Sequence, residues 1–548
     1  MAHALAGKPV QEQDIIDVQT IVDAYFDNVP DMTNPTQLVS FGTSGHRGTS
    51  VDGTFTDLHV AAITQAICDG RKQFGATGPI FVGQDTHALS QPALVTVLEV
   101  LAGNGVTAMV DCDMAFVPTP SVSRAIIRYN EEHDDKADGI IITPSHNPPD
   151  NGGIKYNTII GGPADTVVTK WIEMRANEYL TAYCESEDFK RISIDNIEPT
   201  AQVPYDYKGL YVEELGDVIN MEAIKAAGPK VLVDTLGGSG ASYWNAIKER
   251  YGLDLTIIHD DYDPTFSFMT YDHDGKVRMD CSSTYVMASV INRIGDFDLA
   301  VGNDPDYDRY GIVVSSGLIS ANTFLTLAAR YLFTTRGWKN KGVGKTVVCT
   351  TMIDKWAADA ETPVFEVPVG FKYFSQLLFD GAIGIGGEES AGASFLKKDG
   401  NVWTTDKDGM IMALLSMEIM AVMGKSALKM TDEFVEEFGN PSFGRIDAPC
   451  KKEQKQILKQ MSAELITATT VDGDPITNIR TTSLYNDMPI DGVRVETDKG
   501  WFVARPSGTE DLYKIYGESY KGDLGLVALL TAGEEIVNAA LNGTIETE

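Results

Sequence analysis

The fold is decided by residues 137–157. They open with Ala137-Asp138-Gly139-Ile140-Ile141-Ile142, continue as Thr143-Pro144-Ser145-His146-Asn147-Pro148, and close with Gly152-Gly153-Ile154-Lys155-Tyr156-Asn157. The apolar run predicts a buried β-strand, which the following prolines, asparagines and glycines end abruptly. Ser145 is therefore expected at the carboxyl end of a strand, where open α/β sheets bind their ligands. The competing interpretation is an ordinary turn, because Ser, Asn and Pro are common turn formers.

Three stretches of the chain share one plan, a β-branched strand that leads through a turn into a helix and then into a second strand. The strands are expected at 79–85 and 107–110, at 230–235 and 254–258, and at 346–350 and 364–367, with helices running to about 101, over 241–249 and over 353–360. Strands that alternate with helices predict mixed or mostly parallel α/β domains.

Each repeat is followed by a further strand and a loop that carries chemistry. These loops are the Ser145 loop, the acidic segment 303–309 and the glycine-rich segment 386–392. The segment from 441 departs from the plan, with a helical stretch at 452–465, strands at 491–496 and 501–504, and a closing helix. We predict three similar mixed α/β domains (1–205, 206–322 and 323–440) and a smaller C-terminal α+β domain (441–548) around a central cleft.

Composition and charge restrict the class of protein. The 548 residues include 44 basic and 78 acidic side chains, a net charge of −34, which disfavours nucleic-acid and anionic-membrane binding. No apolar run is expected to reach membrane-spanning length, and residues 1–13 do not resemble a signal peptide. The six cysteines are scattered without a CxxC pair, as in reduced proteins. A cytoplasmic protein is predicted.

Asp304, Asp306 and Asp308 alternate at a spacing of two, so in an extended loop their carboxylates can converge on a hard divalent cation. An EF-hand is excluded, because Arg309 and Ser315 stand where it needs glycine and glutamate. Mg²⁺ is the better fit. A solvated acidic turn is the alternative, although three like charges at a strand end repel one another unless a cation offsets them.

Two further loops have polar groups suited to a phosphosugar. Glu388-Glu389-Ser390 offers acceptors for sugar hydroxyls, and Arg505-Pro506-Ser507-Gly508-Thr509 combines a guanidinium, two hydroxyls and a flexible backbone that suit a phosphate. For each loop, an exposed polar turn is the alternative.

Together these loops resemble the α-D-phosphohexomutase superfamily, and among its members the four-domain bacterial phosphoglucomutases. The matching motifs, in order, are the Ser145 loop (Thr-x-Ser-His-Asn-Pro), Asp304-Pro305-Asp306-Tyr307-Asp308-Arg309, Gly387-Glu388-Glu389-Ser390 and Arg505-Pro506-Ser507-Gly508-Thr509. The resemblance spans nearly the whole chain.

The resemblance implies reversible interconversion of glucose 1-phosphate and glucose 6-phosphate through a phosphorylated Ser145 and a bound glucose 1,6-bisphosphate. It implies Mg²⁺ on Ser145, Asp304, Asp306 and Asp308, with Lys155 as general acid/base and Arg47 and His146 beside the reacting phosphate. It also implies substrate contacts from Arg309, Lys372, Glu388, Ser390, Arg505, Ser507, Gly508 and Thr509. The expected partner is a small hexose phosphate, and a homodimer stays open.

The chain departs from the pattern at His87, where many superfamily members carry arginine. Three alternatives stay open: a phosphomannomutase or dual-specificity phosphohexomutase, a non-catalytic phosphosugar-binding protein, and a metal-dependent phosphatase that shares Ser145 and the cation. Closure of the site against water would separate a mutase from the phosphatase.

Overall fold

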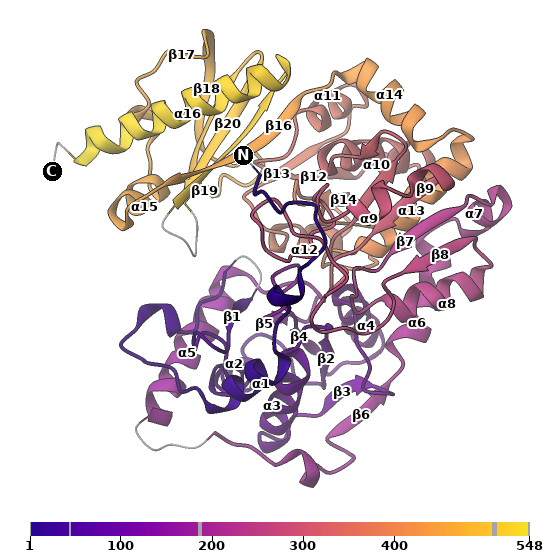
Figure 1. Cartoon of the computed structure of the whole chain (residues 1–548), viewed down its shortest axis with the longest axis vertical. Coiled ribbons are helices and arrows are strands. Elements are labelled where there is room, and N and C mark those ends of the chain that lie inside the picture. The colour runs from indigo at the N-terminus through magenta and orange to yellow at the C-terminus, as the bar shows by residue number, and fades with distance from the viewer. Residues whose placement is uncertain (1, 43–44, 185–188, 507–511, 546–548) are drawn as a thin grey trace. The chain divides into compact units, whose positions relative to one another are not determined.

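The computed structural model describes residues 2–42, 45–184, 189–506 and 512–545 (Figure 1). The chain divides into two compact units, which are described separately. The first comprises residues 1–321, 374–382 and 390–428, and the second comprises residues 322–373, 383–389 and 429–548. Three of the five boundaries fall within α10 (Ala321–Arg336), α12 (Lys372–Phe379) and α14 (Ala427–Phe438), and the other two flank β14 (Ile383–Gly387).

The first unit begins with a six-stranded mixed sheet in the order β1-β5-β4-β2-β3-β6. Its strands are β1 (His46–Thr49), β2 (Ile80–Gln84), β3 (Ala108–Asp111), β4 (Asp138–Ile142), β5 (Asn151–Asn157) and β6 (Gln202–Tyr205), and its helices are α1 (Val18–Asp27), α2 (Asp57–Gly70), α3 (Ser90–Gly103), α4 (Thr119–Glu132) and α5 (Thr166–Cys184). Strands β2 and β4 pair in parallel and β4 and β5 antiparallel. Every residue of β2 and β4 is buried, which confirms the buried strand expected from the isoleucine run.

The first unit also contains a five-stranded sheet in the order β11-β10-β9-β7-β8. The elements of this region are α6 (Tyr207–Val218), α7 (Met221–Ala227), β7 (Val231–Asp234), α8 (Ala241–Tyr251), β8 (Leu255–Ile258), α9 (Ala288–Ile291), β9 (Leu299–Gly302), β10 (Gly311–Val314) and β11 (Gly317–Leu318). Later in the chain, β15 (Ala393–Phe395) and α13 (Gly409–Met423) also belong to this unit. The helix and strands expected over 230–258 are confirmed.

The second unit contains parallel pairs of β12 with β13 and with β14, and then an antiparallel sheet in the order β16-β21-β20-β19-β18-β17. Its elements are β12 (Gly342–Thr346), α11 (Met352–Asp359), β13 (Val364–Val367), β14 (Ile383–Gly387), β16 (Ser442–Pro449), α15 (Lys452–Lys459), β17 (Thr470–Val471), β18 (Asp474–Thr482), β19 (Pro489–Thr497), β20 (Gly500–Pro506), β21 (Leu512–Ser519) and α16 (Gly522–Ile545).

Two boundaries in this unit were wrongly predicted. The strand expected at 346–350 is β12, which ends at Thr346, and Val347 and Val348 lie in the turn after it. Both valines are still buried, in a cluster with Trp501 and Val503, so their apolar character reflects packing rather than strand pairing. The helix expected at 452–465 is shorter, with α15 followed by a separate 3-10 turn at Ala463–Leu465.

Helix α16 packs on β16, β20 and β21 (Figure 1). By length and composition its Gly522–Asn542 segment could cross a membrane, so the expectation that no apolar run reaches that length was wrong. Leu529, Leu530, Val537 and Leu541 are nevertheless buried in the core of this sheet, which accounts for the apolar composition.

Candidate active site

The serine loop is held in an unusual backbone conformation. It follows β4 directly, and Ser145 is buried with a φ of 59°. A non-glycine residue in the left-handed region is uncommon, and strained residues of this kind cluster at functional sites. The Ser145 amide donates to Thr143 Oγ1 at 2.8 Å. A Cβ at Gly153 would lie 2.2 Å from the Thr143 carbonyl oxygen, so glycine is needed where β5 passes the loop.

The acidic loop at 303–309, our candidate metal loop, follows β9 and is a tight turn rather than the extended loop we expected. The Tyr307 amide donates to the Asp304 carbonyl at 2.9 Å, and Tyr307 has a φ of 64°. The turn still brings the carboxylates together, because oxygens of Asp304, Asp306 and Asp308 all lie within 4.8 Å of one another and all three residues are buried.

These carboxylates fit a hard divalent cation. Oδ1 of Asp306 and Oδ1 of Asp308 are buried and accept no hydrogen bond, an arrangement that native structures rarely leave without a ligand. Burial, and then the charges of Asp306 and Asp308, raise the pKa of Asp304, so a cation would relieve the repulsion. Ser145 Oγ donates to Asp304 Oδ2 at 2.8 Å, which places the serine hydroxyl against the cluster.

Two lysines reach the same carboxylates. Lys155, on β5, has Nζ at 2.5 Å from Asp306 Oδ2 and 3.3 Å from Asp308 Oδ2. Burial alone would lower its pKa, but these two carboxylates raise it, so Lys155 is held protonated. Lys407 Nζ lies 2.9 Å from Asp308 Oδ2.

Lys407 is a site residue that our sequence analysis missed. It lies in the loop before α13, whose first residue, Gly409, lies so close to the metal loop that a Cβ there would be 2.0 Å from the Arg309 carbonyl oxygen. The available signal was the charged run Asp406-Lys407-Asp408 immediately before an entirely apolar helix start, because charges beside a buried helix need local partners.

Three predicted residues surround this centre. Burial lowers the pKa of Arg47, on β1, and this residue lies near enough for Asp306 to oppose this shift and for Arg309 to add to it. His146 Nδ1 lies 3.1 Å from Asp280 Oδ2. Arg309 Nη1 lies 3.6 Å from the same carboxylate, and the Arg309 amide donates to Asp304 Oδ1 at 3.0 Å.

Thr119 was also missed. It begins α4, and its Oγ1 donates to Asp306 Oδ2 at 2.7 Å while its amide donates to the Asp306 carbonyl at 2.9 Å. No sequence signal pointed to it, because threonine beside proline at a helix start is ordinary.

The remaining predicted contacts are not gathered around this centre by the described structure. Ser390 belongs to the first unit, and Lys372, Glu388 and Arg505 belong to the second. Glu388 is buried, and the Nε atom of Arg505, at the end of β20, is buried without a hydrogen-bond partner. Ser507, Gly508 and Thr509 lie outside the described residues, as do Thr43 and Ser44 of the loop before β1.

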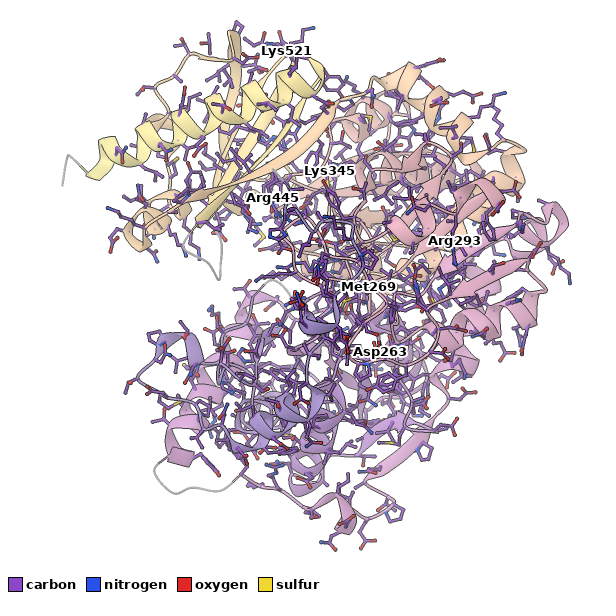
Figure 2. The ribbon with its side chains drawn as sticks, in the orientation of Figure 1. Asp263, Met269, Arg293, Lys345, Arg445 and Lys521 are labelled. Carbon is purple, nitrogen blue, oxygen red and sulfur yellow. The ribbon has the colours of Figure 1, made fainter. Side chains whose placement is uncertain are left out.

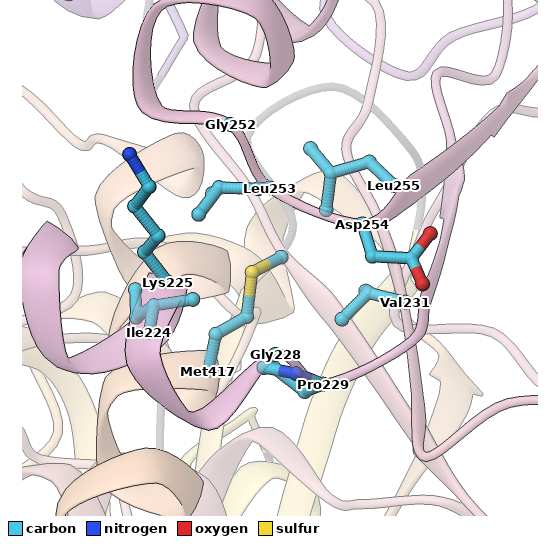
Figure 3. A pocket seen from close by; sticks show the side chains of 10 residues that line it. All are labelled: Ile224, Lys225, Gly228, Pro229, Val231, Gly252, Leu253, Asp254, Leu255 and Met417. Carbon is cyan, nitrogen blue, oxygen red and sulfur yellow. The ribbon is translucent and has the colours of Figure 1, made fainter.

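One pocket, shown in Figure 3, is lined by none of the site residues described above. It has a volume of about 70 Å³ and is lined by residues of α7, β7, β8, α13 and the loop before β8, among them Lys225, Leu253 and Met417. Small-molecule sites usually measure about 300–1,000 Å³, so this pocket is too small for a hexose phosphate.

Comparison with known proteins gives one consistent result. Residues 38–182, 210–317, 320–438 and 447–524 match, in turn, α/β/α domains I, II and III and the C-terminal domain of phosphoglucomutase/phosphomannomutase. The chain is 46% identical over 97% of its length to a phosphoglucomutase of Komagataeibacter xylinus, of which it covers 97%, and 27% identical to phosphoglucomutase 1 of Saccharomyces cerevisiae, with 88% of each chain covered.

Solved structures share the fold at lower identity. The Paramecium phosphoglucomutase pp63/parafusin in its open form is 20% identical with a TM-score of 0.72, covering 94% of this chain and 96% of its own. A family protein of Burkholderia thailandensis is 20% identical with a TM-score of 0.70, covering 92% and 98%. The three α/β domains and the smaller C-terminal domain expected from the sequence are therefore confirmed, and the chain belongs to the phosphoglucomutase/phosphomannomutase family of the α-D-phosphohexomutase superfamily.

Proposed function

We propose that this chain is a phosphoglucomutase, an isomerase that interconverts glucose 1-phosphate and glucose 6-phosphate. The observation that carries the proposal is the Ser145 hydroxyl, which lies in a strained loop and donates to one carboxylate of a buried triad. The 46% identity to a named phosphoglucomutase over 97% of both chains supports glucose phosphates as substrates.

In the proposed reaction, phosphorylated Ser145 transfers its phosphoryl group to the free hydroxyl of glucose 1-phosphate. The resulting glucose 1,6-bisphosphate turns over in the site and returns its other phosphoryl group to Ser145, which releases glucose 6-phosphate. Such transfer depends on positioning and charge neutralisation more than on covalent help from the protein.

The residues around Ser145 support these roles. Asp304, Asp306 and Asp308 would hold Mg²⁺, which, when bound, would neutralise charge on the transferred phosphoryl group. Lys155, held protonated by Asp306 and Asp308, would exchange the proton that passes between Ser145 Oγ and the sugar hydroxyl. Arg47 and Arg309 would bind phosphate oxygens.

Sugar and distal-phosphate contacts remain proposals drawn from the motifs. Glu388 and Ser390 would accept hydrogen bonds from sugar hydroxyls, Lys372 would contact the substrate, and the Arg505-Ser507-Gly508-Thr509 loop would hold the phosphate that is not reacting.

Arg505→Ala should then raise KM and increase bisphosphate release per turnover. If both values matched wild type, Arg505 would be a surface residue only.

The decisive experiment is a coupled assay of Ser145→Ala with glucose 1-phosphate, glucose 1,6-bisphosphate and Mg²⁺. The variant should fold and show no turnover. Ser50→Ala is the matched control, since Ser50 is also buried with one hydrogen bond from Oγ, to the Ile21 carbonyl, and it should retain full activity. Mutase activity in Ser145→Ala would overturn the covalent mechanism.

The same assay separates the alternatives. Mannose 1-phosphate in place of the glucose ester tests dual specificity, and a rate equal to that with glucose phosphate would favour it. Release of inorganic phosphate as fast as isomerisation would favour a phosphatase.

EDTA should stop turnover and Mg²⁺ should restore it, whereas full activity in EDTA would show that the aspartates do not hold a catalytic metal.

A further inference from the structure

We propose that His87 is a positioning residue that fixes the Ser145 loop from both sides and so holds the serine hydroxyl in place for phosphoryl transfer. The proposal rests on the proposed function for the role of Ser145. Its structural part stands independently, because it concerns only how the loop is held.

His87 links two segments that are far apart in the chain. It lies three residues after β2 and is 1% exposed. Its Nδ1 lies 2.8 Å from Asp85 Oδ2 and its Nε2 lies 3.0 Å from the Asn147 carbonyl oxygen. A carboxylate and a carbonyl can only accept, so both ring nitrogens donate and the ring is the imidazolium form.

From Asp85, hydrogen bonds continue through Thr143 to the backbone amide of Ser145. Asp85 is fully buried, and its Oδ2 also accepts from Thr143 Oγ1 at 2.6 Å. The Thr143 hydroxyl oxygen in turn accepts from the Ser145 amide at 2.8 Å. His87 and Thr143 both donate to Asp85, and Thr143 accepts from the Ser145 amide, so each group on the path has a defined orientation.

The two loop residues that these hydrogen bonds reach lie on either side of Ser145 in the chain. Thr143 and Asn147 each lie two residues from Ser145, whose φ of 59° is disfavoured for serine. A disfavoured backbone conformation persists only where its surroundings determine it. The hydrogen bonds of His87 reach one flank of the loop through Asp85 and Thr143, and the other flank directly at the Asn147 carbonyl.

An ordinary buried histidine would give a different pattern. His59 is equally buried, but its Nδ1 contacts Thr56, within one turn of its own helix, and its Nε2 contacts the Gln37 carbonyl at 2.8 Å. Neither partner belongs to the serine loop. His59 therefore provides a control for the general cost of removing a buried histidine.

The test compares His87→Ala and His87→Gln with His59→Ala in steady-state kinetics. Glutamine can donate at one end of the contact but not at both. Because a misplacement of about 1 Å can cost about 100-fold in rate, kcat should fall about 10- to 100-fold in His87→Ala and less in His87→Gln. KM should change less than about 3-fold, and His59→Ala should keep the wild-type kcat.

A second measurement does not depend on catalysis. Amide hydrogen exchange in the peptide that contains residues 143–147 should be faster in the His87 variants than in wild type and unchanged in His59→Ala. If wild type lacks mutase activity but the exchange result holds, the proposed function fails, while the role of His87 in holding the Ser145 loop stands.

Thr143 provides an independent route if neither His87 variant folds. Thr143→Val removes the link between Asp85 and the Ser145 amide, and Thr143→Ser restores it, so valine should lower kcat and speed exchange while serine rescues both. A folded His87→Gln with wild-type kcat and wild-type exchange, or a Thr143→Val variant with both values unchanged, would overturn the proposal.

Discussion

The two units each bury a cluster of charged side chains, and the clusters differ in how fully they are paired. In the first unit, three carboxylates crowd within 4.8 Å, and two of their oxygens accept no hydrogen bond. In the second, Glu366 on β13 receives both branches of Arg480, at 2.5 and 2.8 Å, and Arg480 also reaches Glu496 at 3.2 Å. Arg494 Nε donates to Glu496 at 2.6 Å.

The second cluster has the properties of a structural network. Among the described atoms, none of these four side chains has a buried polar atom without a partner. Lys345, labelled in Figure 2, adds a buried cation that pairs with Asp354. Complete pairing suggests that this network holds β13, β18 and β19 together, whereas incomplete pairing around the aspartates indicates a site that binds something else.

The largest expected effect is on folding in the second unit. Glu366→Ala leaves the buried Arg480 without its main partner, and breaking a buried pair this way costs about 3–5 kcal/mol. Urea denaturation should show this loss while kcat stays near wild type. Arg445→Ala is the control, since its pair with Asp447 is about 40% exposed on both sides and should contribute about 1 kcal/mol or less. Equal losses would erase the distinction between structural and surface pairs.

The reverse pattern is expected for Asp306→Asn in the first unit. Removing one of three like charges relieves repulsion that offsets the lost contact with Lys155, so stability should change little. Activity should fall about 100-fold or more, since changes outside the direct ligands alone often cost about 10–100-fold. Steady-state kinetics and metal-free denaturation of one preparation measure both. A large stability loss with activity retained would make the aspartates structural.

The contrast between the clusters also explains what the sequence could predict. The serine and metal loops were predictable because each follows a run of buried apolar residues within a repeated unit, and the chemistry lies in contiguous residues. Lys407 and Thr119 could not be predicted, because they reach the aspartates from the loop before α13 and from the start of α4, far away in the chain. The strand at β12 was misplaced because Val347 and Val348 are buried by packing against Trp501 rather than by strand pairing.

Mg²⁺ should stabilise the two units unequally. A ligand at about 100 times its dissociation constant adds about 2.7 kcal/mol to the state that binds it. Hydrogen exchange of peptides around β4 and β9 should therefore slow when Mg²⁺ replaces EDTA, while peptides of β18 and β19 remain unchanged. Asp306→Asn should remove the response. A uniform response across both units would point to a general salt effect.

The smallest expected effect is a pH dependence of the second cluster. Burial raises the pKa of Glu366, but the hydrogen bonds from Arg480 and the charges of Lys345 and Arg494 outweigh burial and lower it below the ordinary 4.5. The unfolded chain then binds this proton more readily than the folded chain does. The contribution of Glu366 to stability is thus complete above about pH 5 and declines as pH falls through the folded pKa. Urea denaturation at several pH values should show the stability advantage of wild type over Glu366→Gln to be constant near neutrality and smaller in acid. An advantage that grew in acid would mean that the paired carboxylate is not the stabilising form, and the view of this cluster as a fully paired network would fail.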